Sequence, residues 1–315
     1  MKYNQVRLNS GATMPVIGFG TYSSQNEREE TKQAVLTALK LGYRHFDTAK
    51  IYGSEPALGD AITGAILDGV TGRGDVFLTS KLWSSDHHDP VSAIRQTLKK
   101  LRMEYVDLYL VHWPVKLKTW VDYPVPREED FERLELEATW SGMERCLDLG
   151  LCRSIGVSNF SSKKVHRLLD YASVTPAVNQ VEMHPMWRQT KLREFSKDHK
   201  IHVSAYSPLG GPGNLWGSTA VIDHPIIQSI ALKHGATPAQ VALRWGLSKG
   251  ASVIVKSFNR DRIKENIGAL NLTLDEQDLI NIEKMEQWKI MRGEFLVNDT
   301  TSPYKNIQGL WDDEI

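Results

Sequence analysis

Cysteine is scarce in this sequence, which holds only Cys146 and Cys152 among its 315 residues. Two thiols without metal-ligating neighbours suit a reducing compartment, so we expect a cytoplasmic protein without a disulfide framework. A surplus of charge is missing too, because 38 basic side chains balance 38 acidic ones. This balance argues against a general electrostatic affinity for nucleic acid or for an acidic membrane surface.

Long apolar stretches are also missing. No uninterrupted apolar run approaches the ~18 residues that a membrane span requires, and residues 1–5 hold no apolar signal segment. Secretion and membrane insertion are therefore not expected. A chain of this length buries a large core without disulfide bonds. Because no repeat, low-complexity tract or linker interrupts the sequence, we expect residues 1–315 to form one domain.

Short β-rich runs alternate with longer amphipathic stretches about eight times. Most runs are continuously apolar at their centres, which is typical of parallel strands covered on both faces. The expected strands are 16–20, 44–48, 75–82, 106–113, 154–159, 177–182, 202–207 and 252–257. The expected helices are 29–41, 55–67, 90–101, 137–149, 161–171, 190–199, 225–234, 238–248 and 261–269. Ser161 and Thr237 are candidate N-caps, and Gly42, Gly150 and Gly250 follow predicted helix ends.

Eight strand–helix units in about 250 residues fit a closed (β/α)8 TIM barrel better than an open, doubly wound sheet. The phosphate-binding Gly-x-Gly-x-x-Gly motif of such an open sheet is missing after the first strand. Two short alternating segments around residues 9–11 predict a β-hairpin that caps the barrel floor. Three long segments, 116–136, 210–223 and 288–315, are rich in Pro, Gly and Trp, and we expect them to cover the active site.

Polar side chains stand at the end of nearly every predicted strand. In a barrel these ends and the loops after them form the rim where catalytic groups collect. The strand-end residues are Asp47, Lys81, His112, Ser158, Asn159, Gln180, Tyr206, Ser207, Lys256 and Ser257. Tyr52 follows Asp47 closely enough to lean over the same rim.

Asp47, Tyr52, Lys81 and His112 form a candidate proton-donating site. A phenol with its ordinary pKa of ~10 is a weak acid at neutral pH. We expect Lys81 to lower the pKa of Tyr52, and Asp47 to keep Lys81 charged and oriented. A neutral His112 would donate to the same carbonyl oxygen and stabilise its developing negative charge.

These four residues supply a proton but no electrons, nucleophile or metal, so a bound hydride donor must complete the chemistry. We expect Tyr206 to stack on a nicotinamide ring, and Lys256 with Arg262 to hold a phosphate beyond the eighth strand. The candidates for holding the nicotinamide carboxamide are Ser158, Asn159 and Gln180.

Several motifs carry a family resemblance over essentially the whole chain. They are Thr21 and residues 42–52 (GYRHFDTAKIY), 79–83 (TSKLW), 107–114 (DLYLVHWP), 156–160 (GVSNF), 179–182 (NQVE) and 256–266 (KSFNRDRIKEN). Taken in this order, they resemble the aldo-keto reductase superfamily. Residues 205–210 (AYSPLG), 301–305 (TSPYK) and 310–312 (LWD) are similar to the plant aldehyde and ketone reductases within it.

The resemblance implies a monomeric barrel that reduces a small-molecule aldehyde or ketone with NADPH. Tyr52 would be the general acid, Lys81 and Asp47 would tune it, and His112 would orient the carbonyl group. The implied cofactor contacts are Thr21, Ser158, Asn159, Gln180, Tyr206, Ser207, Leu209, Lys256, Ser257, Asn259, Arg262, Glu265 and Asn266. The implied substrate contacts are Tyr22, Trp83 and Trp113.

Individual positions refine this expectation. Lys256, Ser257 and Arg262 match the family's contacts to the 2′-phosphate that distinguishes NADPH from NADH, and the planar fork of Arg suits that phosphate. His112 stands where the double-bond-reducing branch has Glu, which favours carbonyl reduction. Two positions depart from the usual pattern, because many members have Trp at Tyr22 and Thr or Ser at Asn259.

Other interpretations remain open. Asp47 and Lys81 could form a purely structural ion pair. The chain could be a regulatory subunit that senses NADPH and turns over slowly. A metal-dependent hydrolase would use residues 86–89 (DHHD), but adjacent loop histidines rarely face one ion. We expect a solvated loop there, with Asp89 at the start of a helix, and no metal site. For Trp120, Trp216 and Trp288 we favour packing roles.

Overall fold

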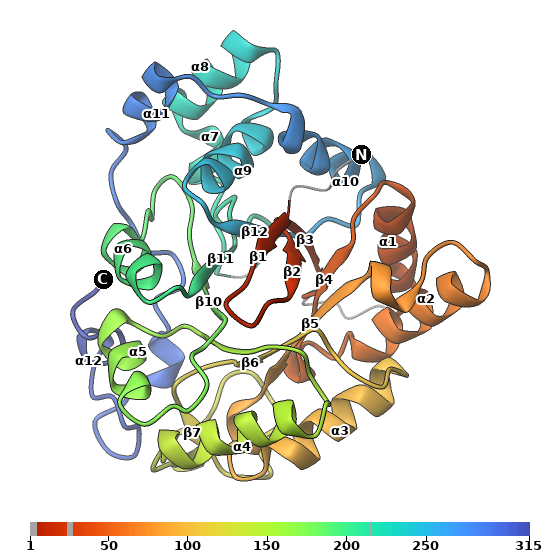
Figure 1. The fold of residues 1–315 in the computed structure, drawn as a ribbon. Helices are drawn as coiled ribbons and strands as arrows, with labels where there is room; N and C mark the ends of the chain where they lie inside the picture. The colour runs from red at the N-terminus through yellow and green to blue at the C-terminus, as the bar shows by residue number, and fades with distance from the viewer. Residues whose placement is uncertain (1–4, 24–27, 215) are drawn as a thin grey trace.

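The structure is a computed structural model that describes residues 5–23, 28–214 and 216–315. Within these residues eight parallel strands close into a barrel, and the predicted (β/α)8 fold is confirmed (Figure 1). Around the barrel the strands are β3 (Ile17–Gly20), β4 (His45–Asp47), β5 (Phe77–Leu82), β6 (Leu108–Val111), β9 (Ile155–Ser158), β10 (Val178–Glu182), β11 (His202–Tyr206) and β12 (Ser252–Val255). Each lies inside its predicted range, and pairing of β12 with β3 closes the ring.

Helices surround the barrel as an outer layer (Figure 1). Those that the sequence predicted are α1 (Arg28–Lys40), α2 (Glu55–Leu67), α3 (Pro90–Leu101), α4 (Leu136–Asp148), α5 (Ser162–Leu169), α6 (Thr190–Asp198), α8 (Pro225–His234), α9 (Pro238–Ser248) and α10 (Arg260–Ile267). Ser161 and Thr237 are confirmed as N-caps, since each hydroxyl accepts a hydrogen bond from the backbone N–H three residues later, at 3.2 Å. Gly42, Gly150 and Gly250 have positive φ, as helix-ending glycines do.

Three helices of the described residues were not predicted, and the longest of them is α11 (Glu276–Ile282). Asp275 and Asp278 close a capping box at its start, with reciprocal side-chain to backbone bonds of 2.9 and 3.0 Å. Its seven residues are too few to show an apolar repeat, and the cap is the only local signal for it. The shorter elements are β7 (Lys116–Leu117), β8 (Phe131–Glu132), α7 (Ala220–Asp223), α12 (Ile307–Trp311) and the 3-10 turns η1 (Lys50–Tyr52), η2 (Arg73–Asp75), η3 (Ser84–Asp86), η4 (Glu128–Asp130), η5 (Gly268–Asn271) and η6 (Glu294–Leu296).

A hairpin of β1 (Gln5–Arg7) and β2 (Thr13–Pro15) lies across the barrel end that faces the viewer in Figure 1. Leu8 and Met14 pack there with Phe77, Leu108 and Val178, which begin their strands. The predicted cap on the barrel floor is therefore confirmed, and it closes the amino-terminal ends of the strands.

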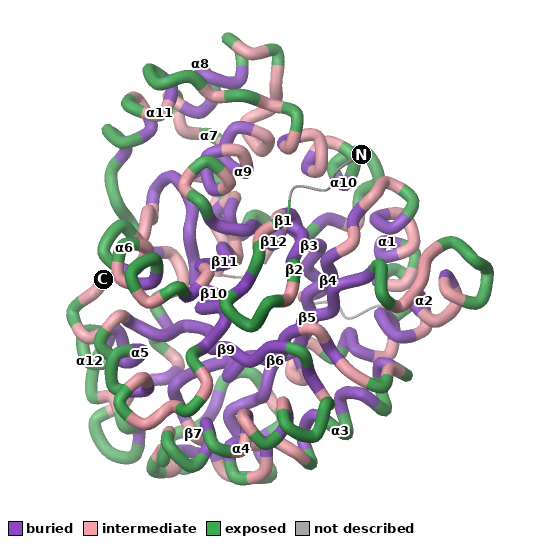
Figure 2. Tube along the Cα trace, viewed as in Figure 1, coloured by how far each residue is buried: buried purple, intermediate pink, exposed green. Residues whose placement is uncertain are grey.

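The barrel strands are buried along almost their whole length (Figure 2). Their outer faces pack against the helices and their inner faces fill the barrel, which explains the continuously apolar runs in the sequence. Within the described residues, no helix has both the length and the apolar character needed to cross a bilayer.

The carboxyl ends of the strands are covered by the first long loop and the tail. Trp83 and Trp113, which follow β5 and β6, share one apolar cluster with Val121 and Phe131 of the loop and with Trp311 of the tail. The second loop also approaches the tail, because a Cβ atom added at Gly210 would lie 3.3 Å from Ile290. The predicted position of these segments over the strand ends is thus confirmed for their described residues.

Two glycines of α2 make a matched test of how closely the helices pack. A Cβ atom at Gly59 would lie 2.5 Å from the backbone oxygen of Leu101, whereas at Gly64 it would meet nothing within 4 Å. Backbone cannot move aside as a side chain can, so we expect Gly59→Ala to lower the free energy of unfolding by about 1–3 kcal/mol. Gly64→Ala should raise it by about 1 kcal/mol through helix propensity. Urea unfolding measures both, and equal midpoints for the two variants would contradict the close contact between α2 and α3.

Candidate active site

Three strand ends and one short turn bring the predicted proton-donating residues together. Asp47 ends β4, Lys81 lies in β5, His112 directly follows β6 and Tyr52 ends the short turn η1. The Lys81 ammonium donates to Asp47 Oδ1 at 2.6 Å and lies 3.4 Å from Tyr52 Oη. The Tyr52 and His112 rings meet edge to face, with centroids 5.6 Å apart. The tyrosine hydroxyl therefore faces the lysine, as the proposed chemistry requires.

The backbone around Tyr52 holds its side chain at the rim. The lysine also donates to the backbone oxygen of Thr48 at 3.0 Å, which ties β5 to the chain that leads into η1. Gly53 then ends the turn with φ +67°, a conformation that glycine adopts without steric cost. Lys81 is 1% exposed, whereas Tyr52 keeps part of its surface exposed at the rim.

Lys81 keeps its positive charge inside the barrel. Burial by itself lowers the pKa of this amine, but Asp47 and Tyr52 outweigh burial and the pKa lies above its ordinary value. The second Asp47 oxygen accepts from Gln180 Nε2 at 2.8 Å, so both oxygens of the carboxylate are held.

Lys81 lowers the pKa of Tyr52 as expected, but it does not determine the net direction of the shift. Burial raises the pKa of Tyr52, and the charge of Lys81 opposes this rise without reversing it. Asp47 adds a smaller upward effect through its negative charge. The phenol consequently stays protonated at neutral pH, and Lys81 acts by limiting the loss of acidity that burial causes.

His112 meets the condition set for it in the sequence analysis. Burial holds its pKa well below the ordinary value, and the nearby Lys81 charge lowers it further. A neutral imidazole next to Tyr52 carries one N–H, which makes it a hydrogen-bond donor without a positive charge.

The residues expected at the nicotinamide carboxamide lie beside these four side chains and bond to one another. The Ser158 hydroxyl donates to the backbone oxygen of Gln180 at 2.8 Å. Asn159 Nδ2 donates to the backbone oxygen of His112 at 2.9 Å, and its Oδ1 accepts from Tyr206 Oη at 2.8 Å. The structure thus gathers these residues at one place, and their contacts to a cofactor stay a prediction.

Thr21 and Tyr22, which follow β3, lie next to Asp47 and Tyr52. The Thr21 hydroxyl donates to the backbone oxygen of Asp47 at 3.0 Å and shares a hydrogen bond with Ser54 Oγ at 2.8 Å. The Tyr22 ring meets Tyr52 at 5.1 Å between centroids. The chain after β3 therefore borders the acid directly.

The expected phosphate-binding residues gather where β12 leads into α10. Ser257 Oγ accepts from the Asn259 backbone N–H at 3.1 Å, and Asn259 caps α10 by accepting from Arg262 N at 3.0 Å. Lys256 and Arg262 are exposed, and neither forms a salt bridge within the described ranges. Burial lowers the pKa of Lys256, the charge of Glu30 opposes this, and the charge of Arg262 adds a smaller lowering effect. Two neighbouring cations that form no ion pair with the described residues suit an anion.

The remaining cofactor candidates lie around this turn and at the end of β11. Glu265 accepts a hydrogen bond from Thr237 Oγ1 at 2.7 Å, which connects α10 to the cap of α9, and Asn266 is buried. Ser207 has φ +49° and its backbone oxygen accepts from Gly210 N, so β11 ends in a tight turn. Leu209, in that turn, is partly buried.

The aromatic substrate candidates form part of the wall next to His112. Trp83 meets His112 at 5.4 Å, and Trp113 meets Phe295 at 5.9 Å and Trp311 at 6.0 Å. The two tail residues Phe295 and Trp311 were not predicted as wall residues, because nothing in the local sequence indicates which loop side chain will meet a distant one.

Trp120, Trp216 and Trp288, for which we favoured packing roles, differ in burial. Trp120 is 66% exposed and Trp288 is 48% exposed, so packing encloses neither side chain. Trp216 is half-buried and lies against Gly211.

The segment 86–89 is not the solvated loop that we expected. Asp86 pairs with Lys50 at 2.6 Å, whereas His87 is only 3% exposed and burial lowers its pKa to about 3. His88 Nδ1 contacts the Ser85 backbone oxygen, and Asp89 caps α3 as predicted. The four side chains therefore take separate partners or environments, because the chain turns sharply through η3.

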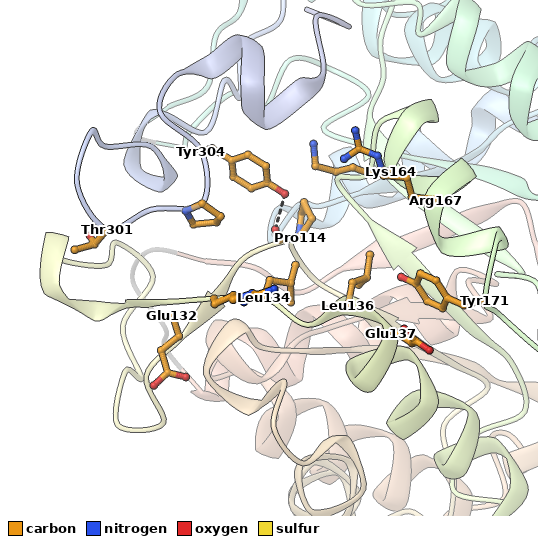
Figure 3. A pocket seen from close by; sticks show the side chains of 12 residues that line it. Pro114, Glu132, Leu134, Leu136, Glu137, Lys164, Arg167, Tyr171, Thr301 and Tyr304 are labelled. Atoms are coloured by element: carbon orange, nitrogen blue, oxygen red, sulfur yellow. Dashed lines mark hydrogen bonds between the residues drawn. The ribbon is translucent and has the colours of Figure 1, made fainter.

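A cavity of about 530 Å³ lies beside the rim, between the end of the first loop, α5 and the tail (Figure 3). Tyr304 Oη donates to the backbone oxygen of Pro114 at 2.9 Å along one side of it. Lys164 and Arg167 project from α5 on another side. None of Asp47, Tyr52, Lys81 and His112 lines this cavity, so it is distinct from the proton-donating site.

Comparison with known proteins agrees with this geometry. The model of the Aldo/keto reductase family matches residues 16–287. The chain belongs to this family. The resemblance drawn from the motifs is confirmed, and this aldo-keto reductase is an oxidoreductase, as predicted.

Plant proteins are among the relatives of this aldo-keto reductase. It is 47% identical over 307 residues to deoxymugineic acid synthase 1 of Hordeum vulgare, covering 96% of this chain and 98% of the relative. It is 45% identical over 310 residues to 7-acetyl-epi-neemfruitin B aldo-keto reductase of Melia azedarach, covering 98% and 96%. It is 44% identical over 312 residues to aldo-keto reductase family 4 member C11 of Arabidopsis thaliana, covering 98% of each.

Proposed function

We propose that this aldo-keto reductase reduces an aldehyde or ketone to the alcohol with NADPH, and that Tyr52 is the general acid. The observation that carries the proposal is the line of three groups from Asp47 through Lys81 to Tyr52, with contacts of 2.6 and 3.4 Å. This contact allows the ammonium to stabilise the phenolate that forms when Tyr52 releases its proton.

The chain's own residues perform the proton half of the reaction. Tyr52 Oη donates a hydrogen bond to the carbonyl oxygen and releases its proton as negative charge develops there. Lys81 stabilises the resulting phenolate, and Asp47 keeps the ammonium charged and oriented toward Tyr52. A neutral His112 donates a second hydrogen bond to the same oxygen and fixes the orientation of the carbonyl plane. The bound cofactor supplies the hydride.

The described residues fit NADPH at two places. Lys256 and Arg262, exposed and without an acidic partner within 4 Å among the described residues, suit the 2′-phosphate. Ser158, Asn159 and Gln180 offer hydroxyl and amide groups next to the acid for the carboxamide. The other proposed cofactor contacts are Thr21, Tyr206, Ser207, Leu209, Ser257, Asn259, Glu265 and Asn266.

The aromatic wall supports a small organic carbonyl compound as substrate. Trp83 and Tyr22 border the His112 and Tyr52 rings, and Trp113 joins them to the tail. Aromatic walls bind the apolar body of a ligand while a few polar groups fix its orientation. The Hordeum and Melia relatives are each named for a small organic compound, which supports a small-molecule substrate.

We also propose one domain over residues 1–315, a monomer and a cytoplasmic location. A closed barrel with a capped floor and a covered rim supports a self-contained unit. Cys146 and Cys152 are both free and buried, which supports a reducing compartment.

A titration combined with a turnover assay tests the proposal against its alternatives. We expect the protein to quench NADPH fluorescence on binding and to oxidise NADPH, followed at the nicotinamide absorbance, with members of an aldehyde and ketone panel. Binding without oxidation across the whole panel would favour the regulatory subunit. Absence of binding would remove the proposed cofactor.

A further inference from the structure

A buried carboxylate at the end of β10 holds the tail to the barrel. Glu182 Oε1 accepts from the backbone N–H of Ile290 at 2.8 Å, and Oε2 accepts from that of Met291 at 2.9 Å. His184 Nε2 lies 3.0 Å from the first oxygen. Glu182 is 0% exposed, so a fully dry carboxylate bonds a segment more than a hundred residues away in the sequence.

Lys289 brings a second charge into the same dry region. Its ammonium lies 3.4 Å from Glu182 Oε2 and 3.8 Å from the ring centroid of Trp311. The side chain is 1% exposed, and a cation over an indole face in such a place is strongly attracted to it. The lysine therefore connects the barrel strand to one tail tryptophan.

Trp311 connects Lys289 to the aromatic wall of the proposed substrate site. Its Nε1 donates to the backbone oxygen of Arg292 at 2.7 Å, and its ring meets Trp113, the residue after His112, at 6.0 Å. Gly293, with φ +77°, turns the tail so closely that a Cβ atom there would lie 2.8 Å from Leu310 and 3.6 Å from Trp113. A continuous series of contacts thus runs from Glu182 to the wall beside the acid.

Stability alone does not account for this arrangement. Buried ion pairs are often no more stabilising than apolar side chains of similar volume, because both charges lose their hydration. An ion pair does, however, have one preferred geometry, whereas apolar side chains slide past one another at small cost. The carboxylate also satisfies two tail N–H groups that would otherwise be buried without an acceptor.

We propose that Glu182 and Lys289 are positioning residues that set the place of Trp311 and Trp113, and so determine which carbonyl substrates fit beside Tyr52. The effect on substrates rests on the proposed function. The positioning of the tail does not, and it is measured separately.

The test compares Glu182→Gln with the double variant Glu182→Gln/Lys289→Met and with Glu283→Gln, which removes an exposed carboxylate that pairs with Arg188 and Lys249. For Glu182→Gln we expect amide hydrogen exchange in residues 288–293 and 307–313 to accelerate about tenfold or more. The KM of bulky carbonyl substrates should rise about tenfold, with a smaller change in kcat and an unchanged Kd for NADPH. Glu283→Gln should change none of these quantities.

The double variant separates positioning from stability. It removes both buried charges, so its midpoint of thermal unfolding should return toward that of the wild type, while tail exchange stays fast and the KM stays high. Recovery of the KM together with stability would overturn the proposal, as would unchanged tail exchange in a folded Glu182→Gln protein. If the wild type reduces no carbonyl compound, the proposed function fails, and the exchange data still decide whether Glu182 positions the tail.

Discussion

Replacing Tyr52 with phenylalanine is expected to lower kcat for carbonyl reduction by about 10²- to 10⁴-fold, which is the usual worth of a general acid. The variant keeps the ring that meets Tyr22 and His112, so the shape of the site is retained. It loses only the hydroxyl that faces Lys81. The Kd for NADPH, measured by fluorescence quenching, should therefore not change.

The pH profile gives a second readout of the same residue. Burial raises the pKa of Tyr52, and the protonated phenol is the active form in reduction. The kcat/KM of the wild type should thus stay level through neutral pH and fall only as the pH passes this raised pKa, above the ordinary ~10 of a phenol. The Tyr52→Phe variant should lack this alkaline fall.

Tyr105→Phe is a matched control, because it removes a hydroxyl from a ring that stacks with Arg73 and Arg153 away from the four catalytic candidates. Its kcat should equal that of the wild type. Turnover of Tyr52→Phe close to the wild-type value would remove Tyr52 as the acid.

Replacing Arg262 or Lys256 with alanine is expected to raise the Kd for NADPH by about 10- to 100-fold, since charge-assisted hydrogen bonds contribute about 1.5–3 kcal/mol each. The Kd for NADH should change far less, because NADH has no 2′-phosphate. The two cations lie at the junction of β12 and α10 and form no salt bridge with the described residues that their loss would disturb.

Lys264→Ala provides the control for these variants. Lys264 is an exposed cation on the same helix, outside the proposed phosphate contacts, and its loss tests whether net charge alone controls affinity. We expect both Kd values to stay near those of the wild type. Equal weakening of NADPH and NADH binding in the Arg262 and Lys256 variants would mean that these residues do not select the 2′-phosphate.

Local patterns were sufficient to predict the barrel strands, most helices and the floor cap. The apolar runs, the Ser161 and Thr237 caps and the glycines after helices all report on neighbouring residues, and the structure agrees with them. The missed helix α11 depends on a two-residue cap and on its packing against α8. A seven-residue helix is too short for its periodicity to be read.

The local sequence did not predict which polar side chains are buried. His87 lies in a polar tetrapeptide, and only the packing of η3 against β7 and the start of α4 encloses it. The net shift of the Tyr52 pKa could not be predicted for the same kind of reason. The sequence indicates that Lys81 lies near Tyr52. It does not show how deeply Tyr52 is buried, and burial raises the pKa that the lysine's charge lowers.

The sequence by itself determined the barrel and the four side chains at its rim, because strand periodicity and strand-end position are local properties. Its motifs, through their resemblance to a family, indicated the reaction class. Only the tertiary structure decided how the rim is covered. Glu182 meets Ile290, and Trp113 meets Trp311, across more than a hundred residues of chain. Such contacts depend on how the whole molecule packs, because a short stretch of sequence does not indicate which distant segment it will contact.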